Sequence, residues 1–307
     1  MTRAEVAQLY TPIYDEFMLQ EYGEETQVHP KIFQIIEDST KEYKTDGLSG
    51  LGEWVDADED TDGGLETPVQ GYVKTFTQTK FWKKFYATFE AVDQDEYALL
   101  KKEGEARSMG RGARAKIEKD CAAVLYNGFG ASGLSPDGQY LFDTDHDKST
   151  EETSVHYDNL LSGALSHDNL EAAEKQIADH FKDPAGIPIP QPERPLLVYP
   201  PALRGKVMRL LSDRANEQPD TALRNINRFA GKYEAVEWRY LSADMGGSDT
   251  AWYIIFKEMN MLKVIWSAKP SFSAWIDEQL ERYWFKGRML NDCGATDWRA
   301  GFASTGI

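Results

Sequence analysis

The longest regular pattern in the sequence runs from about Asp95 to Asn127 and is typical of a single α-helix. Apolar residues recur there at spacings of three and four positions, acidic residues stand at its beginning, and Gly128 follows its end. At about 1.5 Å per residue such a helix would be ~50 Å long, which is longer than a compact domain of this size needs. The sequence therefore predicts a helix that serves as a beam for the rest of the chain.

Three glycines lie inside this pattern, at positions 104, 110 and 112. Each of them lowers helix stability by up to about 1 kcal/mol relative to alanine. We therefore expect the helix to bend or break near Gly104, Gly110 or Gly112.

Composition limits the classes of protein that the chain can belong to. Of the 307 residues, 41% are hydrophobic and 12% aromatic, as in folded globular proteins. The formal charge is −17 and no basic stripe is apparent, which disfavours a protein that grips nucleic acid by its phosphates. Cys121 and Cys293 are too few for a zinc site or a disulfide framework, and a bridge between them is disfavoured in a reducing cytosol. No membrane span or signal peptide is apparent.

The first third of the chain contains segments that cannot bury themselves. Residues 1–46 carry isolated aromatics with little periodicity, so we expect an arm that packs on something else. Seven acids with no base lie between Glu53 and Glu66, among several glycines, which predicts a projecting loop. Residues 69–92 alternate β-branched and aromatic residues with lysine and threonine, and this predicts one or two long strands leaving a protruding hairpin.

In the C-terminal half, predicted helices and strands alternate, which indicates an α+β or mixed fold. Ser166 is expected to begin a helix whose apolar face carries Leu170, Ala173 and Ile177. A proline-rich connector, 183–195, precedes a predicted buried strand. The remaining predicted elements are strands at 196–200, 233–241, 251–256 and 280–290 and a helix at 202–213.

Two short motifs imitate ligand-binding loops. The segment from Gly128 to Gly133, GFGASG, matches the dinucleotide fingerprint, but it follows a predicted helix instead of linking a strand to a helix, so a glycine-rich connector is preferred. The acidic run DADEDTDGG spaces Asp58, Asp60 and Asp62 like calcium ligands, yet Val69 stands where the bidentate glutamate belongs. A solvated loop tip is preferred there, with a loose surface cation site as the alternative.

The segment LFDTDHD contains the densest set of hard ligands, Asp143, Asp145, His146 and Asp147. The other histidines are scattered along the sequence, so a catalytic centre would have to be assembled from distant parts. A polar turn is the preferred interpretation, and a metal-dependent hydrolase using Asp143, Asp145 and His146 is the enzyme alternative. We assign no catalytic, cofactor-binding or metal-binding residue, expect no cofactor, and expect that the chain is not an enzyme.

The order of these features resembles the major head subunits of Mu-like tailed phages and prophages, which have the Hong Kong 97 fold. Each local match is weak alone, and their order and spacing carry the resemblance. The family usually has a smaller or apolar residue and a proline in the first match, where this chain has Asp143, Asp145 and Asp147. The matches are LFDTDHD, SVHYDNLLSGALSHDNLEAA, PLLVYPPALRGKVMRLL, AWYIIF and YWFKGRMLNDCGATDWRAGFAS.

The resemblance implies an α+β capsid fold whose parts follow one another along the chain. The implied parts are an N-terminal arm at 1–46, an extended E-loop at 47–84, a P domain at 85–157 with the spine helix at about 95–127, an A domain at 158–272, and a return to the P domain at 273–307, part of which can add a strand to the A domain.

The implied function is that of a major capsid protein, whose hexamers and pentamers tile the icosahedral shell around the genome of a tailed phage. The implied partners are other copies of the chain, together with scaffolding, portal and decoration proteins. DNA would be enclosed without sequence-specific binding, no membrane would be involved, and the shell, part of the virion, would assemble in the host cytoplasm. The sequence has no long heptad-like leader, so we expect the scaffold to be a separate protein. An encapsulin-like nanocompartment shell is the alternative of the same fold.

Overall fold

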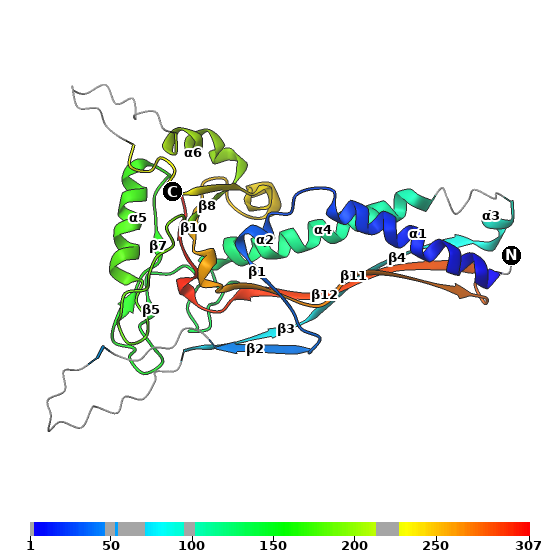
Figure 1. The fold of residues 1–307 in the computed structure, drawn as a ribbon, viewed down its shortest axis with the longest axis horizontal. Helices are drawn as coiled ribbons and strands as arrows, with labels where there is room; N and C mark the ends of the chain where they lie inside the picture. The colour runs from blue at the N-terminus through cyan, green and yellow to red at the C-terminus, as the bar shows by residue number, and fades with distance from the viewer. Residues whose placement is uncertain (1–2, 47–52, 55–70, 95–101, 213–226) are drawn as a thin grey trace.

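The computed structural model describes residues 3–46, 53–54, 71–94, 102–212 and 227–307. Figure 1 shows an elongated lobe, in which long helices lie along long strands, and a second lobe at one end that carries α5, α6 and a separate sheet. The helices are α1 (Arg3–Gly23), α2 (His29–Ile32), α3 (Phe89–Gln94), α4 (Glu103–Tyr126), α5 (His167–His180) and α6 (Arg204–Leu210). No helix among these residues is long and apolar enough to cross a membrane.

Helix α4 is the predicted beam, and it is unbroken from Glu103 to Tyr126. At about 1.5 Å per residue it is ~36 Å long. Residues 95–101, where the predicted helix begins, lie outside the described residues. The expected break at the glycines was wrong for this part of the helix. Gly110 has a packing role instead, because a Cβ there would collide with the carbonyl oxygen of Met18 on α1.

The expectation that residues 1–46 form an arm without partners in its own subunit was also wrong for the described part. Helix α1 packs along α4, and Arg107 and Arg111 of α4 both bind the carboxylate of Glu21. Tyr14 of α1 is fully buried against Phe85 and Phe285 of the sheet. The sequence pattern did not predict this helix, because α1 contains Pro12 and its apolar and polar residues are not separated onto opposite faces.

A four-stranded sheet supports the two long helices, in the order β1-β11-β12-β4. Strands β11 and β12 form a long antiparallel hairpin. The sequence pattern predicted only its second strand, at 280–290, and missed β11. Pro270 in β11 lies at the register shift between Ala268 and Ser271, where a strand tolerates proline. The strands are β1 (Gln34–Glu37), β4 (Thr79–Thr88), β11 (Leu262–Asp277) and β12 (Arg282–Ala295).

The predicted hairpin is present at its base. Strand β2 (Glu42–Asp46) pairs antiparallel with β3 (Val73–Thr77), and β4 follows directly and pairs with β12. The acidic stretch at 55–66, with its calcium-like spacing, lies outside the described residues.

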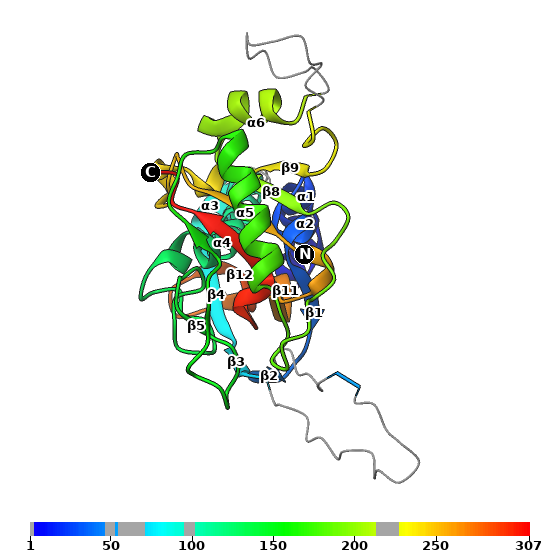
Figure 2. The same ribbon diagram turned by 90° about the vertical axis from the view of Figure 1, so that its left-hand side faces the viewer.

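The second lobe contains a five-stranded sheet in the order β7-β13-β10-β8-β9. Figure 2 shows α5 crossing in front of this sheet, with α6 at its upper end. The predicted helix start is confirmed, because the Ser166 hydroxyl accepts a hydrogen bond from the Asn169 amide. The strands are β7 (Leu160–Leu161), β8 (Leu196–Tyr199), β9 (Glu234–Glu237), β10 (Trp252–Ile255) and β13 (Gly301–Ser304), and a separate pair is β5 (His146–Asp147) with β6 (His156–Tyr157).

The domain boundary expected at residue 272 falls inside the continuous strand β11. Strand β13 belongs to the sheet of the second lobe, so the last residues return to that lobe after β12 has run along the elongated one. The largest buried cluster joins the two lobes, since it combines the end of α4 with β8, β10, β11 and β12. The lobes are therefore packed through one core.

Candidate functional site

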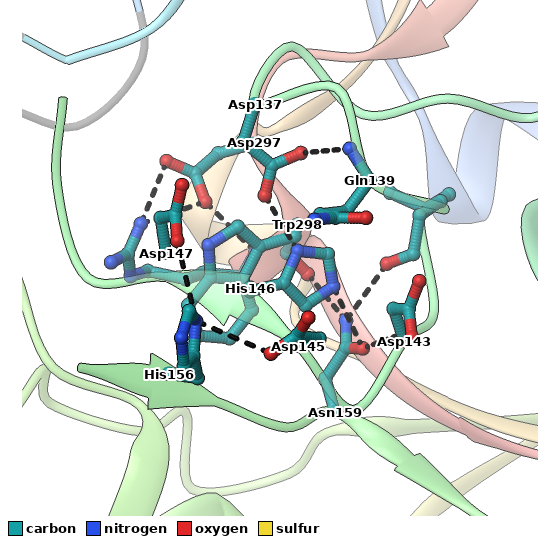
Figure 3. A network of polar contacts seen from close by, with 12 residues as sticks. Asp137, Gln139, Asp143, Asp145, His146, Asp147, His156, Asn159, Asp297 and Trp298 are labelled. Carbon is teal, nitrogen blue, oxygen red and sulfur yellow. Dashed lines mark hydrogen bonds and ion pairs between the residues drawn. The ribbon is translucent and has the colours of Figure 1, made fainter. Parts of the chain in front are cut away.

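The segment with the densest hard ligands lies where the loop 134–147, strand β6 and the C-terminal residues 297–301 meet (Figure 3). His146, at the start of β5, is fully buried, and its ring stacks on the indole of Trp298 with centroids 4.6 Å apart and planes 10° apart. Its Nδ1 lies 2.6 Å from Oδ2 of Asp137, and its Nε2 lies 3.2 Å from Oδ1 of Asn159.

Asn159 determines where the protons of this cluster lie. Its Nδ2 donates to the carbonyl oxygens of Leu141, Trp298 and Gly301 at 2.9, 3.0 and 3.2 Å, which fixes Oδ1 toward His146. Because an amide oxygen can only accept, Nε2 of His146 must carry a proton.

Arg299 covers the opposite face of Trp298, with its guanidinium carbon 4.3 Å from the ring centroid. It is buried, donates to both carboxylate oxygens of Asp297, and donates to the carbonyl oxygens of Lys182 and Lys148. A buried arginine of which every guanidinium nitrogen donates a hydrogen bond fixes the segments that it touches. Trp298 is thus clamped between two buried polar groups.

The remaining acids of the segment face the surface. His156 lies 3.3 Å from both Asp145 and Asp147, and Asp145 is 61% exposed. Asp143 uses its backbone amide to bind Asn159. No group of three or more histidine, cysteine, aspartate or glutamate side chains in the described ranges is arranged to hold a metal ion. Both nitrogens of His146 are occupied, so the set proposed for a hydrolase does not converge on one open site, and the cluster acts as a structural clamp.

The glycine motif likewise has a structural setting. It begins as a short 3-10 turn, Asn127–Phe129, and the element directly before it is the helix α4, not a strand. A Cβ at Gly128 would press on the ring of Phe142. The nucleotide fingerprint is therefore a close-packed connector, as the sequence context predicted.

One face of the elongated sheet gathers cations and aromatic rings that the sequence analysis did not connect. We call it the basic-aromatic face. Along β4 and β12 the alternate residues pair across the strands, Lys84 with Lys286 and Trp82 with Arg288. The expectation that the chain has no basic stripe was wrong, because these cations lie about 200 positions apart in sequence. The face comprises Lys80, Trp82, Lys84, Tyr86, Trp275, Arg282, Trp284, Lys286 and Arg288.

The rings of this face hold the cations in place. Lys84 Nζ lies 4.1 Å from the Trp284 ring centroid, and the Trp284 ring stacks on Trp275 at 6.0 Å. Among the described residues none of the five cations forms an ion pair, although Asp277 and Glu281 are near one end of the strands. Since lysine and tryptophan already cover the Trp284 ring, stacking of a flat ligand on it is disfavoured. With respect to the residues that the structure describes, the face therefore presents unpaired positive charge.

A groove of about 650 Å³ adjoins this face and shares Trp82 and Arg288 with it. Its floor is apolar, with Met18, Met109 and Met289 contributed by α1, α4 and β12. Because alternate residues of a strand point to opposite faces, Met289 points to the helix side of the sheet and the basic-aromatic residues point to the other side.

Comparison with known proteins places this architecture in a family. A family model described as "Phage capsid protein" matches residues 71–304, which is most of the chain. The chain belongs to this family of phage capsid proteins. The search of curated proteins found no match to the sequence.

Solved structures agree with the family assignment at the level of the fold. The procapsid of bacteriophage JBD30 matches with 17% identity and a TM-score of 0.52, over 99% of this chain and 76% of that one. The capsid of cyanophage P-SCSP1u matches with 8% identity and a TM-score of 0.58, over 91% and 88%. A virus-like particle from Pyrococcus furiosus matches with 10% identity and a TM-score of 0.50, over 96% and 99%. The chain therefore has the Hong Kong 97 fold of phage capsids, and the Mu-like branch stays a prediction.

Proposed function

We propose that this capsid protein assembles as hexamers and pentamers into the icosahedral shell of a tailed phage, in the cytoplasm of the host and with separate scaffolding, portal and decoration proteins. The observation that carries the proposal is the family match over residues 71–304. The shell is held by contacts between copies, and the chain makes no covalent bonds in a substrate. The clamp around Trp298 serves this role by fixing the C-terminal residues to the second lobe.

The arm, E-loop, P domain and A domain are proposed as the parts of the subunit, with the limits 1–46, 47–84, 85–157 and 158–272 and a return at 273–307. The continuity of β11 supports a division nearer residue 262 than 272, where the chain leaves the second lobe. In the described part of the arm, α1 packs on α4 of its own subunit. The arm therefore stabilises its own subunit, in addition to any neighbour that it contacts.

The contact between neighbours that we propose joins the acidic stretch from Glu53 to Glu66 of one copy to the basic-aromatic face of the next. Four aspartates in this stretch, at 56, 58, 60 and 62, alternate with other residues. The basic-aromatic face carries Lys80 and Lys84 on β4 and Arg282, Lys286 and Arg288 on β12. The two segments therefore carry opposite charge.

Charge reversal tests this contact. The variant with Lys84→Glu and Lys286→Glu should form folded subunits but few shells, as judged by sedimentation and electron microscopy of protein produced with its phage partners. The matched control reverses Lys175 and Lys206, exposed cations on α5 and α6 of the second lobe. Restoration of shells by an added Asp58→Lys and Asp60→Lys change would support the pairing. Equal loss of shells in the control would contradict it.

The nanocompartment alternative rests on the likeness to the Pyrococcus furiosus virus-like particle. The two functions differ in what the particle encloses. Particles purified from the native source should contain double-stranded DNA if the shell belongs to a phage, and a folded protein cargo if it is a nanocompartment. DNA-free particles filled with one cellular protein would overturn the proposed phage function.

A further inference from the structure

The two cysteines of the chain face each other across the interface between α4 and the sheet. Cys121 belongs to a row on α4 that repeats every fourth residue and faces the core, in which only Ala113 is partly exposed: Met109, Ala113, Ile117, Cys121 and Leu125. Such i, i+4 rows form the ridges by which a helix packs on its neighbour. Cys121 is fully buried, and Cys293 of β12 is half-buried against the same cluster.

The packing register of α4 on β12 brings the two cysteines to the same height. Near the other end of the interface, a Cβ at Gly287 of β12 would lie 3.4 Å from Sδ of Met109. From Met109 to Cys121 the helix rises about 18 Å. From Gly287 to Cys293 the strand advances about 20 Å, over an even number of residues, so Cys293 points to the same face as Gly287. Cys121 and Cys293 therefore lie at about the same distance along the interface between α4 and β12.

The contact itself agrees with this register. The pKa of the Cys121 thiol is raised by burial and by the neighbouring Cys293 thiol, as expected of two side chains that lie close together. Both are free thiols in this structure. A disulfide between this pair would link α4 covalently to the sheet.

We propose that Cys121 and Cys293 are a redox-timed staple: two thiols while the protein is made in a reducing cytosol, and one disulfide after the particle reaches an oxidising exterior. The timing rests on the proposed function, whereas the ability to form the bond rests only on the geometry of one subunit. Intracellular thiols are kept reduced, and disulfides persist outside the cell.

The oxidant is a small-molecule disulfide such as oxidised glutathione. Cys293, which solvent reaches, loses its proton and attacks one sulfur of this disulfide, which gives a mixed disulfide and releases one glutathione thiolate. Cys121 then loses its proton and attacks the sulfur of Cys293, which releases the second glutathione and forms the protein disulfide. Two electrons pass from the protein sulfurs to glutathione, and two glutathione thiols are the products. Burial raises the pKa of the Cys121 thiol, so the second step is the slow one.

The bond would tie the last turns of α4 to β12 within one subunit. Because the two residues are far apart in sequence, the link closes a long loop of the unfolded chain and so stabilises the folded subunit. Helix α4 could then no longer slide or tilt away from the sheet at this end.

The first experiment uses the full chain and no assembly. Protein purified in a phosphine reductant is transferred to oxidised glutathione under native conditions, and its intact mass, the peptides linked after digestion and the melting temperature are measured. We expect the loss of two hydrogen atoms, a linked peptide pair containing Cys121 and Cys293, and a melting temperature higher by roughly 5 °C or more. The Cys293→Ala variant should show no such difference between reduced and oxidised samples.

Three results would overturn the staple: both thiols still alkylated after the treatment, a stable glutathione adduct on Cys293, or a link between two chains. The second experiment concerns timing. Alkylation during cell lysis should trap both thiols, and particles collected from the medium without reductant should carry the disulfide. Disulfide-linked protein in the freshly lysed cells would overturn the timing. If the purified chain forms the disulfide but released particles do not carry it, the timing is overturned and the ability to form the bond stands.

Discussion

Oε2 of Glu118 on α4 accepts a hydrogen bond of 2.7 Å from the indole nitrogen of Trp238, which follows strand β9 of the second lobe. The other oxygen, Oε1, accepts from the backbone amides of Val28 and His29 and lies 2.8 Å from Nδ1 of His29. Glu118 and His29 are both buried. One carboxylate thus joins α4, the segment at α2 and the second lobe.

The change Glu118→Gln should destabilise the subunit by about 2–4 kcal/mol, because an amide nitrogen replaces one acceptor and faces a donor in a buried site. The free energy of unfolding in urea measures this effect. Glu103→Gln on the same helix is the matched control, since Glu103 is half-exposed and forms a pair with Arg107 that contributes only about 0.3–0.5 kcal/mol. Similar losses in both variants would contradict the bridging role of Glu118.

Gly110→Ala and Gly104→Ala should change stability in opposite directions. A methyl group at Gly110 collides with the carbonyl oxygen of Met18 and pushes α1 away from α4, at a cost of about 1–3 kcal/mol. At Gly104 no atom lies within 4 Å of the added methyl, so alanine should raise helix stability by up to about 1 kcal/mol. Melting temperatures of the two variants compare these effects, and a stabilised Gly110→Ala would show that the helices do not approach so closely.

The histidines of the clamp region allow a comparison of buried and exposed polar groups. His146→Ala removes two hydrogen bonds and the stack on Trp298 and leaves Asp137 buried without its partner, so we expect a loss of about 3–5 kcal/mol. His156→Ala removes only contacts with half-exposed acids and should cost less than about 1 kcal/mol. Calorimetric unfolding of both variants is the measurement, and an equally mild His146→Ala would mean that the cluster does not clamp the C-terminal residues.

The parts of the fold that the sequence predicted are those with a local pattern. Ser166 identified the beginning of α5 because its cap is local, and the apolar run of β8 lies on a strand buried on both faces. Strand β11 was missed because its first half is buried on both faces while its second half carries Pro270 and a bulge, so no single period of two runs through it.

The functional surfaces depend on contacts that a linear pattern does not contain. Lys84 and Lys286 become neighbours only when β4 pairs with β12. The partner of His146 was missed for the same reason, since Asp137 lies in a preceding turn and Trp298 near the C-terminus. The local signal of a basic face in the sequence was the presence of several cations and a tryptophan in each of two short segments, 80–84 and 282–288.

Salt distinguishes pairing from repulsion at the acidic stretch of the proposed shell. If the stretch binds the basic-aromatic face, raising the salt concentration should weaken the shells, because charges more than about 10 Å apart are screened at 0.1 M and exposed pairs weaken as well. Changing Asp58, Asp60 and Asp62 together to Asn should then also weaken shells and reduce their response to salt. The measurement is the fraction of protein in shells across a salt series, for both proteins.

Stronger shells, in place of weaker ones, after either change would indicate repulsion between neighbouring copies. If like charges of neighbouring copies repel, the triple variant should strengthen shells, and added salt should strengthen those of the unchanged protein, since like charges a few ångströms apart cost on the order of 1 kcal/mol even in water. Shells indifferent to both changes would place the stretch in solvent. We expect pairing, because the five cations of the basic-aromatic face form no ion pair with the described residues of their own subunit and the acidic stretch contains no base.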